Sequence, residues 1–196
     1  MLTSYADLLF RMHAELPKCP RALQMEHIRN AVRHFCRQTG IWESELTAID
    51  VVANQQEYDL SAAIPEDTEI LRMVSVKIDG AERNLNYYDL TSGPMLRWNT
   101  NHIPSSASTG GLVITVTLMP LFEDDTLPDN LLTRWSEAIT YYARHSLMAM
   151  PGEPWSRPDK AAYYLEKYQD DESSAKCETY MGHKTGVLTL NTQEWF

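Results

Sequence analysis

Histidine and cysteine are the side chains of this sequence best suited to hold a metal ion. His27 and His34 lie seven residues apart, the spacing of one helical face, and Cys36 follows His34 after one further residue. A structural zinc site needs about four ligands in a tetrahedral arrangement, and Cys36 would point to another side of the helix. We therefore interpret these residues as ordinary, partly exposed side chains, and we expect no metal.

Other patterns come close to catalytic or nucleotide-binding motifs without completing one. The stretch 182–185, Gly-His-Lys-Thr, ends as a phosphate-binding loop does, but it lacks a glycine before the lysine and follows an expected helix rather than a strand. Pairs of acids such as Glu123 and Asp124 could serve glycoside hydrolysis, which needs two carboxyl groups across a cleft, whereas neighbours in sequence do not face each other. The sequence has neither a Gly-x-Ser-x-Gly elbow nor a His-Glu-x-x-His helix. We expect no catalytic residues and no cofactor.

The composition is that of a globular protein. Of the 196 residues, 43% are hydrophobic and 22% are charged, which is unlike disordered or fibrous chains. The three cysteines, Cys19, Cys36 and Cys177, are an odd number without paired spacing, which favours reduced thiols. No apolar run is long enough to span a membrane, and the N-terminus lacks the basic start and apolar core of a secretion signal. We expect a protein made in the cytoplasm that does not enter a membrane.

Charge is distributed unevenly along the chain, whose net charge is −10. Residues 1–40 carry six basic and three acidic side chains, residues 41–130 carry four and fifteen, and residues 131–196 carry seven and nine. The middle part is therefore strongly acidic, with a net charge of −11, and it would repel the phosphates of duplex DNA. It is either a solvated face or a surface that must not hold DNA.

Apolar residues recur with helical spacing in four segments of the chain. These segments cover about residues 5–16, 20–39, 130–150 and 157–180. Three of them are followed by Pro17, Gly40 or Pro151, residues that end helices. Ser156 and Pro158 are typical of a helix start, so we expect the last two helices to form a hairpin with a short, rigid elbow.

Between the second and third helices, the apolar period changes to that of β-strands. Alternating residues predict strands near 46–51, 74–78 and 112–118. The inserted β-region covers about residues 41–120, with a polar loop over 99–111. We predict an α+β fold: a helical bundle of about four helices with an inserted small antiparallel β-sheet, in one domain over residues 1–184, followed by an extended C-terminal tail over residues 185–196.

The expected tail carries apolar residues that lie beyond the last helix. They are Val187, Leu188, Leu190, Trp195 and Phe196. An isolated subunit has little obvious way to bury Trp195 and Phe196, so a tail that adds a strand to a partner's sheet or fills a partner's groove would cover them. Packing back onto the same subunit is the alternative.

Taken in order, several short segments resemble the head-to-tail connector (adaptor) proteins of tailed bacteriophages. The matching segments are Cys19-Pro20, the helix exit Phe35-Cys36-Arg37-x-Thr39-x-x-Trp42, Tyr58-Asp59-Leu60, Asp79-Gly80, Leu127-Pro128-Asp129 and Met150-Pro151-Gly152-Glu153-Pro154-Trp155. The likeness runs from about residue 4 to residue 175, and the sequence departs from the family most after Glu178.

This resemblance implies a structural virion protein rather than an enzyme. Connector subunits form a homo-oligomeric ring, usually of about twelve copies, that docks under the portal protein and presents a platform to a downstream tail or nozzle protein. Double-stranded DNA passes through the ring without specific binding. The subunit would be made in the host bacterial cytoplasm and reside at the head-tail junction of the virion. A neck or tail-tube component beside the connector is one alternative, and a virion-associated peptidoglycan hydrolase is another.

Two sets of charged residues are candidates for roles in such a ring. Arg29, Arg33 and Arg37 recur every four residues along one side of the second helix and could pair with acids of an adjacent subunit. The second set is the acidic run Glu123, Asp124 and Asp125. These carboxylates are candidates for groups that face the DNA channel.

Overall fold

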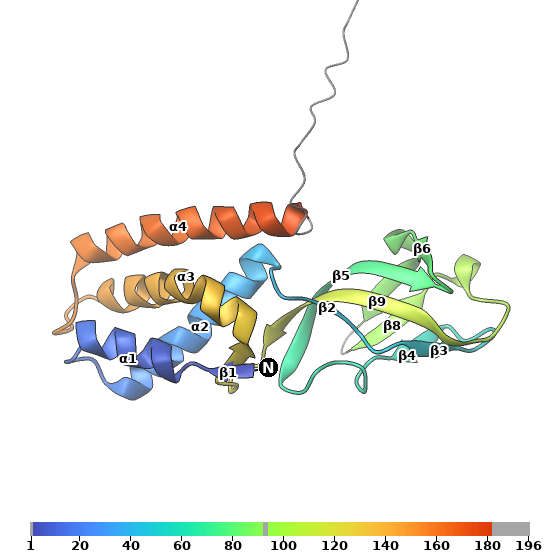
Figure 1. Cartoon of the computed structure of the whole chain (residues 1–196), viewed down its shortest axis with the longest axis horizontal. Coiled ribbons are helices and arrows are strands. Elements are labelled where there is room, and N and C mark those ends of the chain that lie inside the picture. The colour runs from blue at the N-terminus through green and yellow to red at the C-terminus, as the bar shows by residue number, and fades with distance from the viewer. Residues whose placement is uncertain (1, 92–93, 182–196) are drawn as a thin grey trace, which may run out of the picture.

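The helices of the computed structural model gather at one end of the molecule, and most of its strands lie at the other (Figure 1). The structure describes residues 2–91 and 94–181. Within these residues there are four α-helices: α1 (Ala6–Glu15), α2 (Arg21–Thr39), α3 (Asp129–Met148) and α4 (Pro158–Tyr180). Each helix expected from the sequence therefore has a counterpart, with ends that differ by about two residues or fewer.

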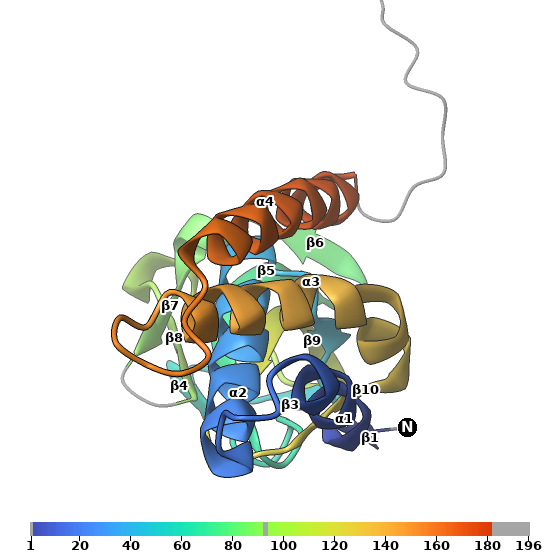
Figure 2. The same ribbon diagram turned by 90° about the vertical axis from the view of Figure 1, so that its left-hand side faces the viewer.

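Helix α3 lies between α1 and α4 (Figure 2). Seen from the helical end, α4 covers one side of α3, and α1 lies on the other side (Figure 2). Helix α2 packs against α3 and also touches α4. The backbone of α3 departs from helical values at Trp135, where φ is −112° and ψ is 15°, so residues 129–134 are set off from the remainder of the helix.

Glycine ends α2 and proline begins α4, as the sequence predicts. Gly40 follows α2 in the left-handed conformation, with φ of +62°, and its N–H donates to the carbonyl oxygen of Cys36 at 2.8 Å. Pro158 is the first residue of α4. Ser156 does not cap α4, because its hydroxyl donates to the carbonyl oxygen of Met148 at 3.3 Å. This bond ties the elbow to the end of α3.

Ten strands form three antiparallel sheets within the described residues. The largest sheet has the strand order β2-β9-β5-β6, and β3 also pairs with β9. Its strands are β2 (Glu43–Glu45), β3 (Ile49–Val51), β5 (Thr68–Ile78), β6 (Ala81–Arg83) and β9 (Ser108–Pro120). The second sheet has the order β4-β8-β7 and consists of β4 (Glu57–Asp59), β7 (Tyr88–Thr91) and β8 (Met95–Trp98). The third pairs β1 (Leu2–Ser4) with β10 (Thr126–Pro128).

The fold predicted from the sequence is wrong in its β part. The chain is α+β, but three sheets take the place of one small inserted sheet, so it is not a helical bundle with an insertion. Strands β5 and β9 pair from Thr68 opposite Pro120 to Ile78 opposite Leu112. Their register shifts twice within β5, before and after Arg72–Met73. A bulge interrupts the alternation of side chains, so the sequence pattern showed only the last part of β5. Strand β9 also begins inside the segment predicted to be a loop.

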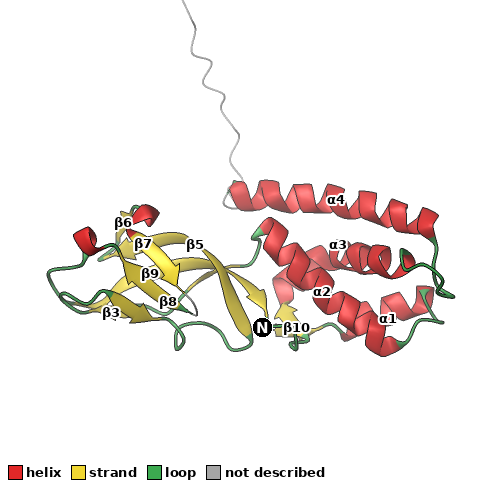
Figure 3. Cartoon of the chain, turned by 180° about the vertical axis from the view of Figure 1, so that it is seen from behind, coloured by secondary structure: helices red, strands yellow, loops and turns green. Residues whose placement is uncertain are grey.

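One hydrophobic core extends through the helices and the sheets. Strand β10 lies between the large sheet and the helices (Figure 3), where it pairs with β1. Tyr5, which follows β1, is fully buried, and its hydroxyl donates to the carbonyl oxygen of Thr126 at 2.9 Å. Trp135, Tyr164 and Tyr168 of the α3–α4 hairpin are buried in the core as well.

Candidate interaction surface

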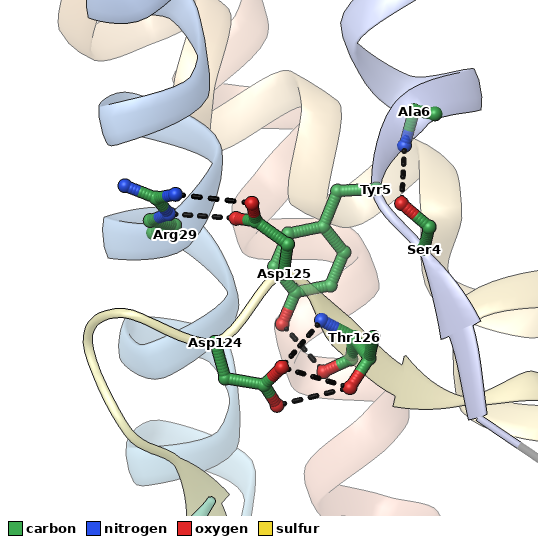
Figure 4. Close-up of polar contacts among 7 residues, drawn as sticks. All are labelled: Ser4, Tyr5, Ala6, Arg29, Asp124, Asp125 and Thr126. Carbon is green, nitrogen blue, oxygen red and sulfur yellow. Dashed lines mark hydrogen bonds and ion pairs between the residues drawn. The ribbon is translucent and has the colours of Figure 1, made fainter.

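The connection between β9 and β10 is held against α2 by two charged side chains. Arg29, on α2, donates from Nε to Oδ1 of Asp125 at 2.7 Å and from Nη2 to Oδ2 at 3.0 Å (Figure 4). A two-point pair of this kind fixes the relative orientation of the two groups as well as their distance. Hydrogen bonding to Asp125 raises the pKa of Arg29 above its ordinary value, because the charged guanidinium is the form that donates both bonds.

Neighbouring bonds fix the same connection to the N-terminal segment. Asp124 accepts hydrogen bonds from the backbone N–H of Thr126 at 3.1 Å and from its hydroxyl at 2.9 Å (Figure 4). The backbone N–H of Tyr5 donates to the carbonyl oxygen of Asp125 at 2.9 Å. Of the three acids expected to face a channel, Asp124 and Asp125 thus bind groups of their own chain, and Glu123 is exposed.

The other two arginines of the row also reach the sheet of their own chain. Arg33 donates from Nη1 to the carbonyl oxygen of Pro120 at 2.5 Å and from Nη2 to Oε1 of Glu69 at 2.7 Å. Nη2 of Arg37 lies 4.0 Å from the sulfur of Met119. The row therefore fastens α2 to the start of β5 and the end of β9. The carboxylates that pair with Arg29 and Arg33 belong to the same chain. An acid of a neighbouring subunit would therefore have to bind guanidinium groups that already pair with these carboxylates.

The apolar residues of the expected tail are not among the residues that the structure describes. Val187, Leu188, Leu190, Trp195 and Phe196 lie outside the described residues. The last described helix, α4, ends at Tyr180, and the side chain of Tyr180 is 94% exposed.

Two histidines of α2 take part in contacts that the sequence does not indicate. Nδ1 of His27 lies 2.7 Å from the hydroxyl of Ser146 on α3, and that hydroxyl donates to the carbonyl oxygen of Ala143 at 2.9 Å. His34 stacks on Tyr142 with a centroid distance of 4.3 Å. Burial lowers the pKa of His27 and of His34 below the ordinary value.

A cluster of charged and aromatic groups joins α1 to the α3–α4 hairpin. The hydroxyl of Tyr164 on α4 donates to Glu15 at the end of α1. Nε of Arg144 lies 3.0 Å from Oε2 of Glu15, although its N–H is not directed at that oxygen, and Nζ of Lys160 lies 3.6 Å from Oε1. Burial and the hydrogen bond to Glu15 raise the pKa of Tyr164 to about 12. One carboxylate thus connects three helices, and helical periodicity alone gives no sign of it.

Between the helices and the large sheet, a hollow of about 420 Å³ opens at the surface. Trp42, Leu131 and Trp135 supply apolar walls, and the ion pair of Arg134 with Glu178 lies at its edge. Among the described residues, His, Cys, Asp and Glu side chains nowhere gather in a group of three or more that could hold a metal ion.

Several large apolar side chains remain uncovered at the surface of a single chain. Phe10 on α1 is 77% exposed and Tyr163 on α4 is 53% exposed. Leu121 and Phe122, in the connection between β9 and β10, are exposed as well. Exposed aromatic residues are common where proteins bind other proteins. These side chains, rather than the arginine row, are the best candidates for contacts with a partner in the described part of the chain.

Comparisons with known proteins add no family assignment. Neither the protein-family models nor the curated proteins compared with this sequence give a match. Among the described residues, none of the helices combines the length and the apolar character that a membrane span requires.

Proposed function

We propose that this chain is a structural, non-enzymatic subunit of a head-to-tail connector (adaptor) ring of a tailed bacteriophage. In this proposal, copies of the chain are made in the host cytoplasm, bind one another around the DNA channel, and join the portal protein of the filled head to a downstream tail protein. The resemblance of the ordered sequence segments is the starting point, and three features of the structure support it.

The observation that carries the proposal is the exposure of aromatic side chains on two helices of the helical end. Phe10 belongs to α1 and Tyr163 to α4, and these helices lie on either side of α3 (Figure 2). In a closed ring each subunit meets its neighbours head to tail, so it needs two different surfaces that fit each other. Exposed aromatic side chains on two different helices offer anchors for such surfaces, because buried aromatic anchors supply much of the binding energy at interfaces.

A second supporting feature is where the connector-like segments lie in the fold. Pro20 directly precedes α2, and Trp42 follows that helix. Asp79 and Gly80 form the turn between β5 and β6, and the segment 150–155 is the elbow between α3 and α4. Residues at such boundaries set the direction of the chain rather than perform chemistry.

The third feature is the charge of the β-region. Residues 41–130 have a net charge of −11, and they form the large sheet, the second sheet and the connection that carries Glu123. A surface with this charge does not hold the phosphates of a passing duplex. A DNA conduit benefits from such a surface, whereas a protein that grips DNA needs the opposite charge.

Native mass spectrometry of the purified chain, alone and mixed with the portal protein, tests the proposal. We expect a closed ring, formed either alone or on the portal. Phe10→Glu and Tyr163→Glu should each prevent ring formation and leave the circular dichroism spectrum unchanged, because both side chains are exposed in the single chain. Gln169→Glu, which adds the same charge at another exposed position of α4, is the matched control and should form rings.

Two results would overturn the proposal. A wild-type chain that remains monomeric at all concentrations and never binds the portal protein would exclude a connector. Electron microscopy of the virion that locates the chain in the tail tube, away from the portal, would favour a neighbouring neck or tail component instead.

A further inference from the structure

Strand β5 presents a free backbone edge over most of its length. Along one side, β5 pairs with β9 from Thr68 to Ile78. Along the other side, β6 pairs only with Val76–Ile78. Within the described residues, the stretch from Thr68 to Ser75 therefore has no strand on its outer side, and backbone N–H and C=O groups of this stretch remain available for pairing.

The side chains of this edge do little to prevent the addition of a strand. Folded proteins commonly protect an edge with charged side chains, lysine above all, with proline, with bulges or by covering it. Between Thr68 and Ser75 there is neither lysine nor proline; the charged residues are Glu69, which pairs with Arg33, and Arg72, and two register shifts flank Arg72–Met73. Four of the residues are apolar: Ile70, Leu71, Met73 and Val74. All four are half-buried, so each would gain further burial from an added strand.

The end of α4 lies beside this part of β5. Thr179 and Tyr180 line a hollow of about 410 Å³ together with Arg72, Met73 and Val74 of β5. Figure 1 shows the C-terminal end of α4 above the middle of β5. The chain therefore leaves its last described helix next to the free edge.

The sequence that follows α4 has the character of a strand. Residues 187–190, Val-Leu-Thr-Leu, combine β-branched and apolar side chains. They are preceded by Gly182 and Gly186, which can adopt the turns needed to change direction after a helix. Only residues 181–186 separate them from α4, and six extended residues span up to about 20 Å.

We propose that residues 187–190 add to the free edge of β5 between Thr68 and Ser75, in the same chain, as a further strand of the large sheet. A short tether gives the chain's own segment an effective concentration in the millimolar range, which favours it over the same segment of another copy. Backbone pairing supplies the affinity, and the hollow beside Met73 and Val74 receives side chains of the added strand. The proposal does not depend on the connector ring, because it concerns a single chain.

Hydrogen exchange measured by mass spectrometry tests this inference. In the full chain at micromolar concentration, we expect peptides from residues 68–75 to exchange about tenfold or more slowly than in a chain truncated after Met181. Residues 187–190 should show similar protection. The double substitution Leu188→Pro with Thr189→Pro should abolish both effects, because in adjacent residues one N–H or the other faces the partner strand. Thr192→Pro with Gln193→Pro, outside the proposed strand, is the matched control.

Three outcomes would overturn the inference. Equal exchange of residues 68–75 in the full and truncated chains would show that the edge stays free. Protection that disappears on dilution, together with the loss of a dimer or ring, would assign the added strand to a second copy. Protection that requires added portal protein would assign the edge to that partner. A chain that forms no ring but keeps the protection would contradict the proposed function and leave this inference intact.

Discussion

Arg29 of α2 and Asp125 of the β9–β10 connection form a two-point ion pair, with Nε–Oδ1 at 2.7 Å and Nη2–Oδ2 at 3.0 Å. The two residues are 96 positions apart in the sequence. Their contact joins the second helix to the segment that enters the third, on the far side of the whole β-region. The pair is therefore a long-range tie between the helical end and the chain that returns from the sheets.

We expect Asp125→Asn to lower the free energy of unfolding by about 1 kcal/mol, since the pair is partly exposed and hydrogen-bonded to a charged group. For a chain of this size the melting temperature should fall by about 2–4 °C. Chemical denaturation measures the change. Glu123→Gln removes the same charge from an exposed neighbour and should have a smaller effect. Equal effects of the two substitutions would mean that net charge, rather than the pair, matters.

Helix boundaries could be predicted from the sequence because the signals are local. Gly40 ends α2 and Pro158 begins α4 through their own backbone preferences. Local signals do not determine tertiary contacts. Ser156 has the right position in the sequence to cap α4, but its hydroxyl donates to the carbonyl oxygen of Met148 at the end of α3 instead. A local pattern shows which bonds a side chain can make, and the tertiary structure decides which it makes.

The β-region and the arginine partners could not be predicted in the same way. The alternation that identifies a strand is interrupted by the two bulges in β5, and short strands such as β4 and β8 hold too few residues to show a period. The spacing of Arg29 and Arg33 places them on one side of α2, but nothing in the spacing reveals which carboxylates face that side. Asp125 and Glu69 come from the same chain rather than from a neighbour.

Removal of the Glu15 carboxylate should destabilise the helical end more than removal of an exposed carboxylate. Arg144, which is largely buried, would lose its ion pair, and the hydroxyl of Tyr164 would lose its acceptor. We expect Glu15→Ala to lower the free energy of unfolding by about 1–3 kcal/mol. Glu166→Ala, on the exposed side of α4, is the control and should change it by less than about 0.5 kcal/mol. Thermal unfolding of both variants distinguishes the cluster from a general loss of acidic charge.

Stability should decrease as the pH falls below about 6.5. Burial lowers the pKa of His27 and His34 in the folded chain, so the unfolded chain, with ordinary values near 6.5, binds protons first as the pH falls. Above this pH both states are neutral at these positions, and no stability is lost. Below it, the free energy of unfolding should fall until the folded histidines also take up protons.

Denaturation at pH 7.5, 6.5 and 5.5 measures this dependence. His34→Gln should reduce the slope between pH 6.5 and 5.5, since it removes one group that must stay neutral against Tyr142. His102→Gln serves as a comparison with a histidine in the β-region. If His34→Gln leaves the slope as it is in the wild type, other groups control the acid sensitivity.

Two glycines with positive φ separate the effect of the backbone from that of a neighbouring side chain. Gly40 has φ of +62° and Gly152 has φ of +80°. Alanine at either position should be strained by about 1–2 kcal/mol in the left-handed region. At Gly40 the added Cβ would also lie 2.6 Å from Nη2 of Arg72, whereas nothing lies within 4 Å of a Cβ at Gly152. The Arg72 guanidinium would have to move from its place over the junction of α2 and the large sheet.

We therefore expect Gly40→Ala to be less stable than Gly152→Ala in chemical denaturation, and Arg72→Ala to remove the difference. If both alanine variants lose the same stability, the guanidinium moves aside freely and does not help to fix α2 on the sheet.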